Sequence, residues 1–206
     1  MPKVVSDREK DMIYEAIYQS TVKLIPKKRL NGITVEDIIN SVNMAKGSFY
    51  KYYQSKNICL YDVITRCERE LFDKIKPVFS EPLSKREMFK KVFKEIYLGD
   101  ESLVLYVKPE EIKVLMRKLP AQYAGKGQAK AKLNFEYILQ LFGLDRNIIS
   151  MGVLDHLICS MHFIASQDGE TAERKVALEL LVNAVVEYLI SGINRKNTRR
   201  KKGKVT

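Results

Sequence analysis

The stretch from Thr34 to Lys56 constrains the fold of this chain more than any other, and it reads TVEDIINSVNMAKGSFYKYYQSK. Its start resembles a capping box, because the Thr34 hydroxyl can accept from a backbone N–H while the Asp37 carboxylate reaches back. Asn43 follows an apolar helical pattern, and Asn tolerates the left-handed conformation that a sharp turn needs. From about Ala45 the pattern becomes helical again. The stretch therefore predicts two short helices around a tight turn.

The second predicted helix carries side chains that can donate hydrogen bonds to DNA. These donors are Lys46, Ser48, Tyr50, Lys51 and Tyr52. A helix, a tight turn and a donor-rich helix make a helix-turn-helix, in which the second helix lies in the major groove. The sequence therefore predicts that the chain binds double-stranded DNA.

The positive charge of the chain is concentrated at its two ends. The formal net charge is +11 at pH 7, which favours an anionic partner. Residues 1–60 hold ten Lys and Arg against six Asp and Glu, whereas residues 61–194 hold 19 of each. Residues 195–206 hold seven basic and no acidic residues, so we expect this tail to repel itself and be disordered.

Cysteine usage and hydropathy indicate a soluble, cytoplasmic protein. Cys59, Cys67 and Cys159 include no close pair, and free thiols in a reducing cytosol explain them better than a disulfide framework. The N-terminus has no apolar signal-peptide core. The longest apolar stretch, Leu157 to Ala165, is much shorter than the ~20 residues that a membrane span requires, so we expect no membrane partner.

Helical spacing of apolar residues recurs along the whole chain, and the alternation typical of strands never persists. Pro and Gly residues mark the breaks between the expected helices. Besides the helix-turn-helix, the expected helices are 7–25, 55–75, 84–97, 109–119, 128–142, 147–167 and 171–193. The predicted fold class is all-α.

This order of helices predicts three parts. A three-helix head that contains the helix-turn-helix is expected over 7–54, and a larger helical body for ligand binding and dimerisation over 55–194. The basic tail occupies 195–206. The helix over 55–75 would connect the head to the body.

The last two long helices, 147–167 and 171–193, carry apolar stripes that are wide enough for contact on two sides. In one interpretation, two such helices from each of two subunits form a four-helix interface. In the other, both are central core helices. Paired helix-turn-helix heads meet successive major-groove faces ~34 Å apart, which favours a homodimer on a palindromic operator.

The motif and the order of helices together resemble the TetR family of bacterial transcriptional regulators. The residues that carry the resemblance are Thr34, Val35, Ile38, Lys46, Gly47, Ser48, Phe49, Tyr50, Tyr52, Tyr53, Ser55 and Lys56. The match covers the region from Ile13 to Leu60, and the rest of the chain agrees in length and helical character.

Some positions depart from the family pattern. The family usually has Gly in the turn, where Asn43 stands, and Ser where Ala45 stands. Ala45 removes a hydroxyl that could cap the recognition helix. Between the first two helices the family usually shows a Gly-aromatic pair, and Arg29 and Leu30 occupy those places. We expect these changes to affect docking on DNA rather than the fold.

The resemblance implies a set of residues that contact DNA. They are Thr34, Lys46, Gly47, Ser48, Tyr50, Lys51, Tyr52 and Lys56. Lys46 and Lys51 would meet phosphates or guanine edges, and Gly47 would let the backbone approach closely. Phe49 and Tyr53 are expected to pack in the core of the head.

The resemblance also implies a homodimeric repressor that a small-molecule effector releases from its operator. An effector can release DNA only if it favours the arrangement that does not bind, and the helix over 55–75 would act as the lever. The alternative is a DNA-binding regulator without an effector, whose body only dimerises or recruits another protein. A helical enzyme with a basic head is a third, less favoured alternative.

Catalytic and metal-binding patterns are absent from the sequence, so we expect neither an enzyme nor a cofactor. There is no Gly-rich phosphate loop, HExxH, GxSxG or paired-carboxylate pattern. Cys159 and His162 have a spacing that could hold a metal on a helix, but no second pair accompanies them.

Overall fold

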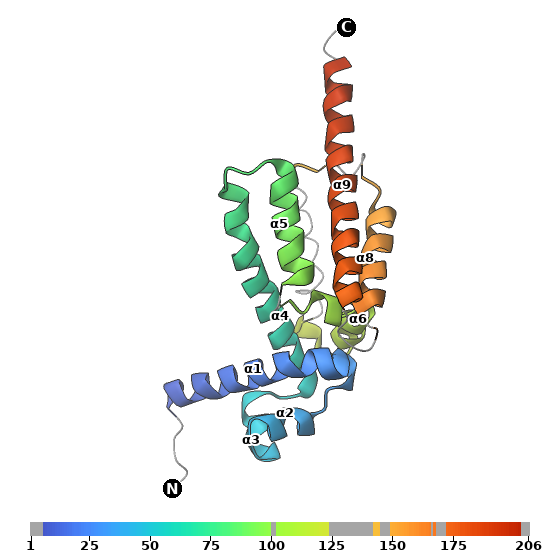
Figure 1. The fold of residues 1–206 in the computed structure, drawn as a ribbon. Coiled ribbons are helices and arrows are strands. Elements are labelled where there is room, and N and C mark those ends of the chain that lie inside the picture. Colours follow the sequence, from blue (N-terminus) through green and yellow to red (C-terminus); the bar gives the residue numbers. More distant parts are fainter. Residues whose placement is uncertain are drawn as a thin grey trace. The chain divides into compact units, whose positions relative to one another are not determined.

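The computed structural model describes residues 6–99, 102–123, 142–144, 149–165, 167 and 172–202. Within these ranges every regular element is a helix (Figure 1), which confirms the predicted all-α fold. The elements are α1 (Asp7–Gly32), α2 (Val35–Ser41), α3 (Lys46–Tyr52), α4 (Lys56–Ile75), η1 (Lys76–Ser80), α5 (Lys85–Leu98), η2 (Val104–Tyr106), α6 (Pro109–Arg117), α8 (Met151–Ala165) and α9 (Ala172–Lys202). The helix expected over 128–142 lies outside the described residues except at its last position.

The chain packs as two compact units. The first comprises Met1–Glu70 and Tyr106–Ala124, and the second comprises Leu71–Leu105 and Gly125–Thr206. Packing thus divides the chain elsewhere than the expected boundary after residue 54, because most of α4 and all of α6 belong with the first unit. The functional roles given to the ranges 7–54 and 55–194 stay predictions.

The first unit is built around α1. A capping box starts this helix, since the Ser6 hydroxyl accepts from the Glu9 N–H and the Ser6 N–H donates to the Glu9 carboxylate at 2.8 Å. α1 packs against α2 and α6, and α2 packs against α3. The side chains of this unit that are fully buried are Ile17, Thr21, Ile25, Ile33, Ile38, Phe49, Cys59 and Val63. Burial of the apolar side chains in this set is the main source of the unit's stability.

α1 does not end at Pro26 as predicted. The helix continues through Pro26, and its run of helical backbone is broken at Arg29, which has φ 59° and ψ 162°. Pro removes one backbone hydrogen bond, but Ile17, Thr21 and Ile25 of the preceding turns are fully buried, and packing of this kind sustains helices that local preference would end. The backbone region of Arg29 is almost restricted to Gly, which explains why Gly is usual at this place in the family.

Three contacts hold the turn from Arg29 to Ile33, which leads directly into α2. The Arg29 guanidinium lies 5.5 Å from the ring centroid of Tyr106. The buried Glu111 carboxylate of α6 accepts from the Asn31 N–H at 3.2 Å, and the Lys56 ammonium of α4 donates to the Ile33 carbonyl at 2.6 Å. The segment before the helix-turn-helix is therefore tied to both α4 and α6.

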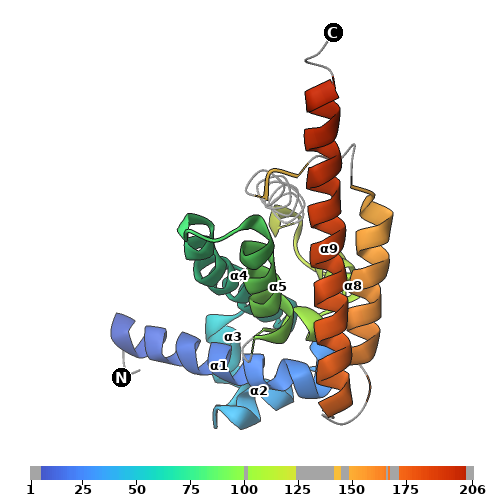
Figure 2. The same cartoon turned by 45° about the horizontal axis from the view of Figure 1, so that its top comes forward.

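The core of the second unit forms between α5, α8 and α9. α9 packs against both of the other helices (Figure 2). Its core side chains that are at most 1% exposed are Phe89, Val92, Met161, Val182, Val185, Val186 and Leu189. Aromatic rings extend this core, since the ring centroids of Phe142 and Phe89 lie 4.6 Å apart in an edge-on contact. Tyr97 is buried in the same core, and this burial raises the pKa of its hydroxyl to about 12.

α9 continues to Lys202, beyond its predicted end at Ile193. The tail expected to be disordered over 195–206 is thus helical as far as Lys202, and residues 203–206 lie outside the described residues. Lys and Arg are good helix formers, and their charge suits the negative end of a helix dipole. These preferences favour the longer helix over the mutual repulsion of its charges.

α9 also contains a segment of apolar composition that is longer than the stretch from Leu157 to Ala165. By length and composition alone, Ala172–Asn194 could cross a membrane, and 33% of its most apolar window is buried inside the protein. The core helix of a water-soluble protein can have the same length and apolar composition. Val182, Val185, Val186 and Leu189 of α9 lie in the core of the second unit, which accounts for this apolar composition.

Candidate nucleic-acid interface

The predicted capping box opens α2. The Asp37 N–H donates to the Thr34 hydroxyl at 3.1 Å, and the Thr34 N–H donates to the Asp37 carboxylate at 2.9 Å. The Lys28 ammonium bonds the same carboxylate at 2.5 Å. These hydrogen bonds, led by that of Lys28, lower the pKa of Asp37 to about 2. Its carboxylate is therefore charged, and the cap intact, at every physiological pH.

The turn between α2 and α3 has the geometry expected from Asn43. Asn43 has a left-handed φ of 50°, and the Met44 N–H donates to the Ile39 carbonyl at 2.9 Å. Ala45 then begins α3 with an extended φ of −70° and ψ of 143°, but it has no side-chain capping bond. The departure at Ala45 thus leaves α3 without the cap that Ser would supply.

α3 has one exposed face and one buried face. Phe49 is fully buried and Tyr53, four residues on, is 5% exposed, so these rings anchor the helix in the core as predicted. Lys46 and Tyr50, also four residues apart, are exposed, and residues at this spacing share a helix face. Lys51 and Gly47 are exposed beside them. The exposed face of α3 therefore presents two ammonium groups and a phenol.

Gly47 is not required by packing in the described part of the chain. A Cβ placed there would have no heavy atom within 4 Å, so it would point into open space. The residue leaves the backbone of α3 uncovered between Lys46 and Tyr50, as a close approach to a ligand would need.

The other residues predicted to contact DNA are partly buried or already make contacts within the protein. The Thr34 hydroxyl is occupied by the cap, and Ser48 is half-buried. Tyr52 meets Tyr14 of α1 edge-on at 5.4 Å, which fixes α3 against α1. Lys56 is half-buried and donates to the Ile33 carbonyl, so its ammonium is engaged within the protein. Contact of these residues with DNA stays a prediction.

An ion pair links α2 to the start of α3. The Lys46 ammonium lies 2.6 Å from the Glu36 carboxylate, and both side chains are more than half exposed. The hydrogen bond from Lys46 holds the pKa of Glu36 below its ordinary value, and the same bond raises the pKa of Lys46. Both groups are therefore charged at neutral pH.

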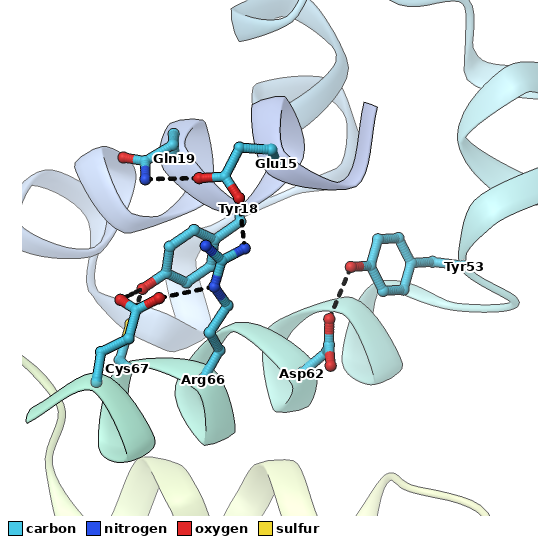
Figure 3. Close-up of polar contacts among 8 residues, drawn as sticks. Glu15, Tyr18, Gln19, Tyr53, Asp62, Arg66 and Cys67 are labelled. Atoms are coloured by element: carbon cyan, nitrogen blue, oxygen red, sulfur yellow. Dashed lines mark hydrogen bonds and ion pairs between the residues drawn. The ribbon is translucent and has the colours of Figure 1, made fainter. Parts of the chain in front are cut away.

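Sequence reasoning missed a polar network that joins α1 to α4 (Figure 3). The Arg66 guanidinium bonds Glu15 of α1 at 2.7 Å and Glu70 of its own helix at 2.8 Å, and it lies 3.7 Å from the ring centroid of Tyr18. The Tyr18 hydroxyl donates to Glu70 at 2.5 Å and contacts the sulfur of Cys67 at 3.4 Å. One cation thus binds two carboxylates and an aromatic face.

A second hydrogen bond from a tyrosine hydroxyl to a carboxylate lies one turn before Arg66 on α4. The Tyr53 hydroxyl, just after α3, donates to the Asp62 carboxylate at 2.9 Å (Figure 3). Asp62, Arg66 and Glu70 follow one another at four-residue intervals, so they form a stripe on α4. The spacing was a possible signal in the sequence, but the partners of the stripe are set by tertiary packing.

The cysteines and histidines do not form a metal site in the described part of the chain, where no cluster of three or more potential ligands occurs. Cys159 is exposed, whereas His162 is buried with Nδ1 3.3 Å from the Leu105 carbonyl. Cys59 and Cys67 are also free thiols. Burial raises the pKa of Cys59 to about 12, which suits a structural thiol.

Comparison by sequence finds a transcriptional regulator. No protein-family model matches the chain. Over 76 residues it is 32% identical to YvdT of Bacillus subtilis (strain 168), an uncharacterized HTH-type transcriptional regulator, and the match covers 37% of each protein. The matched region thus spans little more than a third of that relative.

Solved structures share the fold over most of the chain. A proposed TetR-family transcriptional regulator from Mesorhizobium loti MAFF303099 has a TM-score of 0.55 at 18% identity, over 88% of this chain and 96% of that one. AibR in complex with isovaleryl coenzyme A and operator DNA has a TM-score of 0.53 at 16% identity, over 85% and 97%. The chain therefore has the fold of TetR-family regulators, as the sequence resemblance predicted.

The Arg66 network generates a stability prediction. Replacing Arg66 by Met should lower the free energy of unfolding by about 1–2 kcal/mol, since two carboxylates lose their shared cation. For a chain of this size that corresponds to a Tm lower by roughly 2–8 °C, measured by circular dichroism. Arg66→Lys should recover little of it, because one ammonium lacks the planar fork that serves two carboxylates and a ring.

The pH dependence of this effect has a defined sign. The hydrogen bond from Arg66 lowers the pKa of Glu15. Burial acts to raise the pKa of Glu70, but the hydrogen bonds from Tyr18 and Arg66 together outweigh it, so that pKa is lowered too. The stabilisation is therefore complete above the ordinary Glu value of 4.5 and is lost as the pH falls below it. The matched control is the exposed Arg69→Met. Equal Tm values for the Arg66→Met and Arg69→Met variants would contradict the assigned network. So would a difference in Tm between the two variants that grows as the pH falls.

The uncapped start of α3 generates a second stability prediction. Ala45 has the same extended backbone as the capping residues Ser6 and Ser84, so a serine hydroxyl at this position could take up the capping geometry without strain. Ala45→Ser should raise the free energy of unfolding by about 0.5–1 kcal/mol in a urea titration. Ala45→Val, which adds bulk without an acceptor, is the control. A Ser variant no more stable than the Val variant would refute the missing cap.

Proposed function

We propose that the protein is a homodimeric, cytoplasmic transcriptional regulator that binds operator DNA through α3 and acts as a repressor. The observation that carries this proposal is the exposed face of α3, where Lys46, Tyr50 and Lys51 surround Gly47 above the buried Phe49. Ammonium groups bind phosphates or guanine edges, and a phenol can donate to a phosphate. The shared fold with TetR-family regulators supports the same function.

The second unit supplies an apolar surface suited to a second copy of the chain. Exposed large apolar side chains occur on both α8 and α9, at exposed fractions of 41% or more: Val153, Phe163, Val176 and Leu180. α8 and α9 pack side by side (Figure 2), and exposed apolar groups on neighbouring helices favour association. A symmetric dimer would offer two α3 helices to a palindromic operator.

A small-molecule effector is the proposed signal for release of the DNA. The likeness in fold to AibR, whose structure holds isovaleryl coenzyme A together with operator DNA, supports an effector for this chain too. α4 crosses from the first unit into the second between Glu70 and Leu71. It would therefore carry a change in the second unit to the helix-turn-helix, provided that the effector binds the released state more tightly.

Removal of both α3 ammonium groups tests the DNA interface. The double variant Lys46→Ala, Lys51→Ala should bind the DNA upstream of its own gene roughly 10²-fold more weakly, because each contact to a base or phosphate is lost with its charge. Its helical circular-dichroism signal should be unchanged, since both side chains are exposed. Fluorescence anisotropy across a salt series measures the affinity.

Lys94→Ala, Lys175→Ala is the matched control, because it removes two exposed charges from the second unit. It should retain nearly all of the wild-type affinity. If the α3 variant binds every duplex as tightly as the wild type, α3 is not the recognition helix.

Charged substitutions on α8 and α9 test the dimer. Phe163→Glu and Leu180→Glu each place a carboxylate on the proposed interface, where burial without a partner is unfavourable. Sedimentation equilibrium should show the wild type as a dimer and the combined variant as a monomer. Both native side chains are more than 60% exposed, so the fold should survive.

The control for this experiment is the exposed Glu173→Ala on α9, which should stay dimeric. A wild type that is monomeric at micromolar concentration would refute the homodimer. A dimer that persists in the combined variant would show that the interface lies elsewhere.

A further inference from the structure

We infer that Glu36 masks Lys46 and thereby limits the attraction of α3 to DNA of arbitrary sequence. This inference rests on the proposed DNA-binding function. Glu36 would then tune specificity, although its carboxylate offers no group that a phosphate would bind. The evidence is the ion pair between the first turn of α2 and the first residue of α3.

The position of the pair matters because Lys46 is one of two ammonium groups on the exposed face of α3. Its nitrogen lies 2.6 Å from Glu36 Oε1, so the ion pair is also a charge-assisted hydrogen bond. For Lys51, by contrast, no ion pair occurs among the described residues. Within the part of the chain that the structure describes, this face therefore presents one cation with an ion-pair partner and one without.

Folding gives little reason for the pair. The side chains of Lys46 and Glu36 are 57% and 56% exposed, and exposed pairs contribute little to stability. The N-terminus of α2 already has its cap in Thr34 and Asp37. Asp37 binds Lys28, so the two acidic residues of this turn each hold one Lys. A role in binding explains Glu36 better than a role in the fold.

The effect on DNA binding follows from the charge that Glu36 brings to the interface. If Lys46 leaves Glu36 for a phosphate, the Glu36 carboxylate remains next to a polyanion without its counter-charge. If Lys46 stays with Glu36, it neutralises no phosphate and releases no counterion. Random DNA places no particular base acceptor opposite Lys46, so the competition there comes from phosphates and Lys46 remains paired with Glu36. A specific site adds base acceptors, which can compete for the ammonium.

Neutralising Glu36 tests this account without knowledge of the operator. Fluorescence anisotropy of a random-sequence duplex across a salt series gives both the affinity and its salt dependence. Glu36→Gln should bind this duplex several-fold more tightly at low salt. The slope of log K against log[salt] should steepen by up to ~0.9, the value for one more neutralised phosphate.

Two further variants separate local masking from general charge. Asp11→Asn removes one exposed negative charge from α1 without touching Lys46, and it should have a smaller effect on affinity and none on the slope. When Lys46 is already replaced by Gln, Glu36→Gln should raise the affinity for the random duplex no more than Asp11→Asn does. All the side chains concerned are exposed, so each variant should fold.

Three results would overturn the inference. Equal effects of Glu36→Gln and Asp11→Asn, or an effect of Glu36→Gln that persists in full without Lys46, would mean that only net charge matters. Weaker binding by Glu36→Gln would mean that Glu36 orients Lys46 toward DNA. A wild type that binds no duplex even at low salt would instead overturn the proposed function, and the inference with it.

Discussion

The helix that we propose as the DNA-contacting element is too short to be stable by itself, so its exposed face depends on how that helix is packed. α3 spans only Lys46–Tyr52, and isolated helices of this length do not persist in water. Burial of Phe49 anchors it, and Tyr53 is held through its hydroxyl by Asp62 of α4. One turn farther along α4, Arg66 binds that helix to α1. Rigid contacts behind α3 therefore set the orientation of its exposed face.

The helix-turn-helix was predictable because its signals are local. The cap from Thr34 and Asp37 and the left-handed turn at Asn43 each depend on residues within one or two turns. The end of α1 was predicted wrongly, because the tendency of Pro26 to end a helix is outweighed by the packing of the buried turns before it. Arg29 could be named as a departure, but its strained backbone and its contact with Tyr106 emerge only from the packed turn.

The roles of individual polar side chains were harder to predict than the elements that carry them. Lys56 fits the family pattern for a DNA contact, yet its ammonium holds the Ile33 carbonyl. The spacing of Asp62, Arg66 and Glu70 is visible in the sequence, and it suits the Arg66–Glu70 pair within α4. The other partners of this stripe lie on other segments of the first unit. Glu36 reads as an ordinary first-turn acid. Only the approach of α3 to α2 brings it to Lys46.

In the proposed function, α3 reads DNA sequence rather than merely attracting phosphate. The most direct measurement is a titration of the wild-type protein with the DNA upstream of its own gene and with random DNA, each across a salt series. A sequence-specific dimeric regulator should bind the upstream DNA more tightly than random DNA, by ~10³-fold or more, with two protomers per site. Equal and steeply salt-dependent affinities for both DNAs would contradict the proposed function.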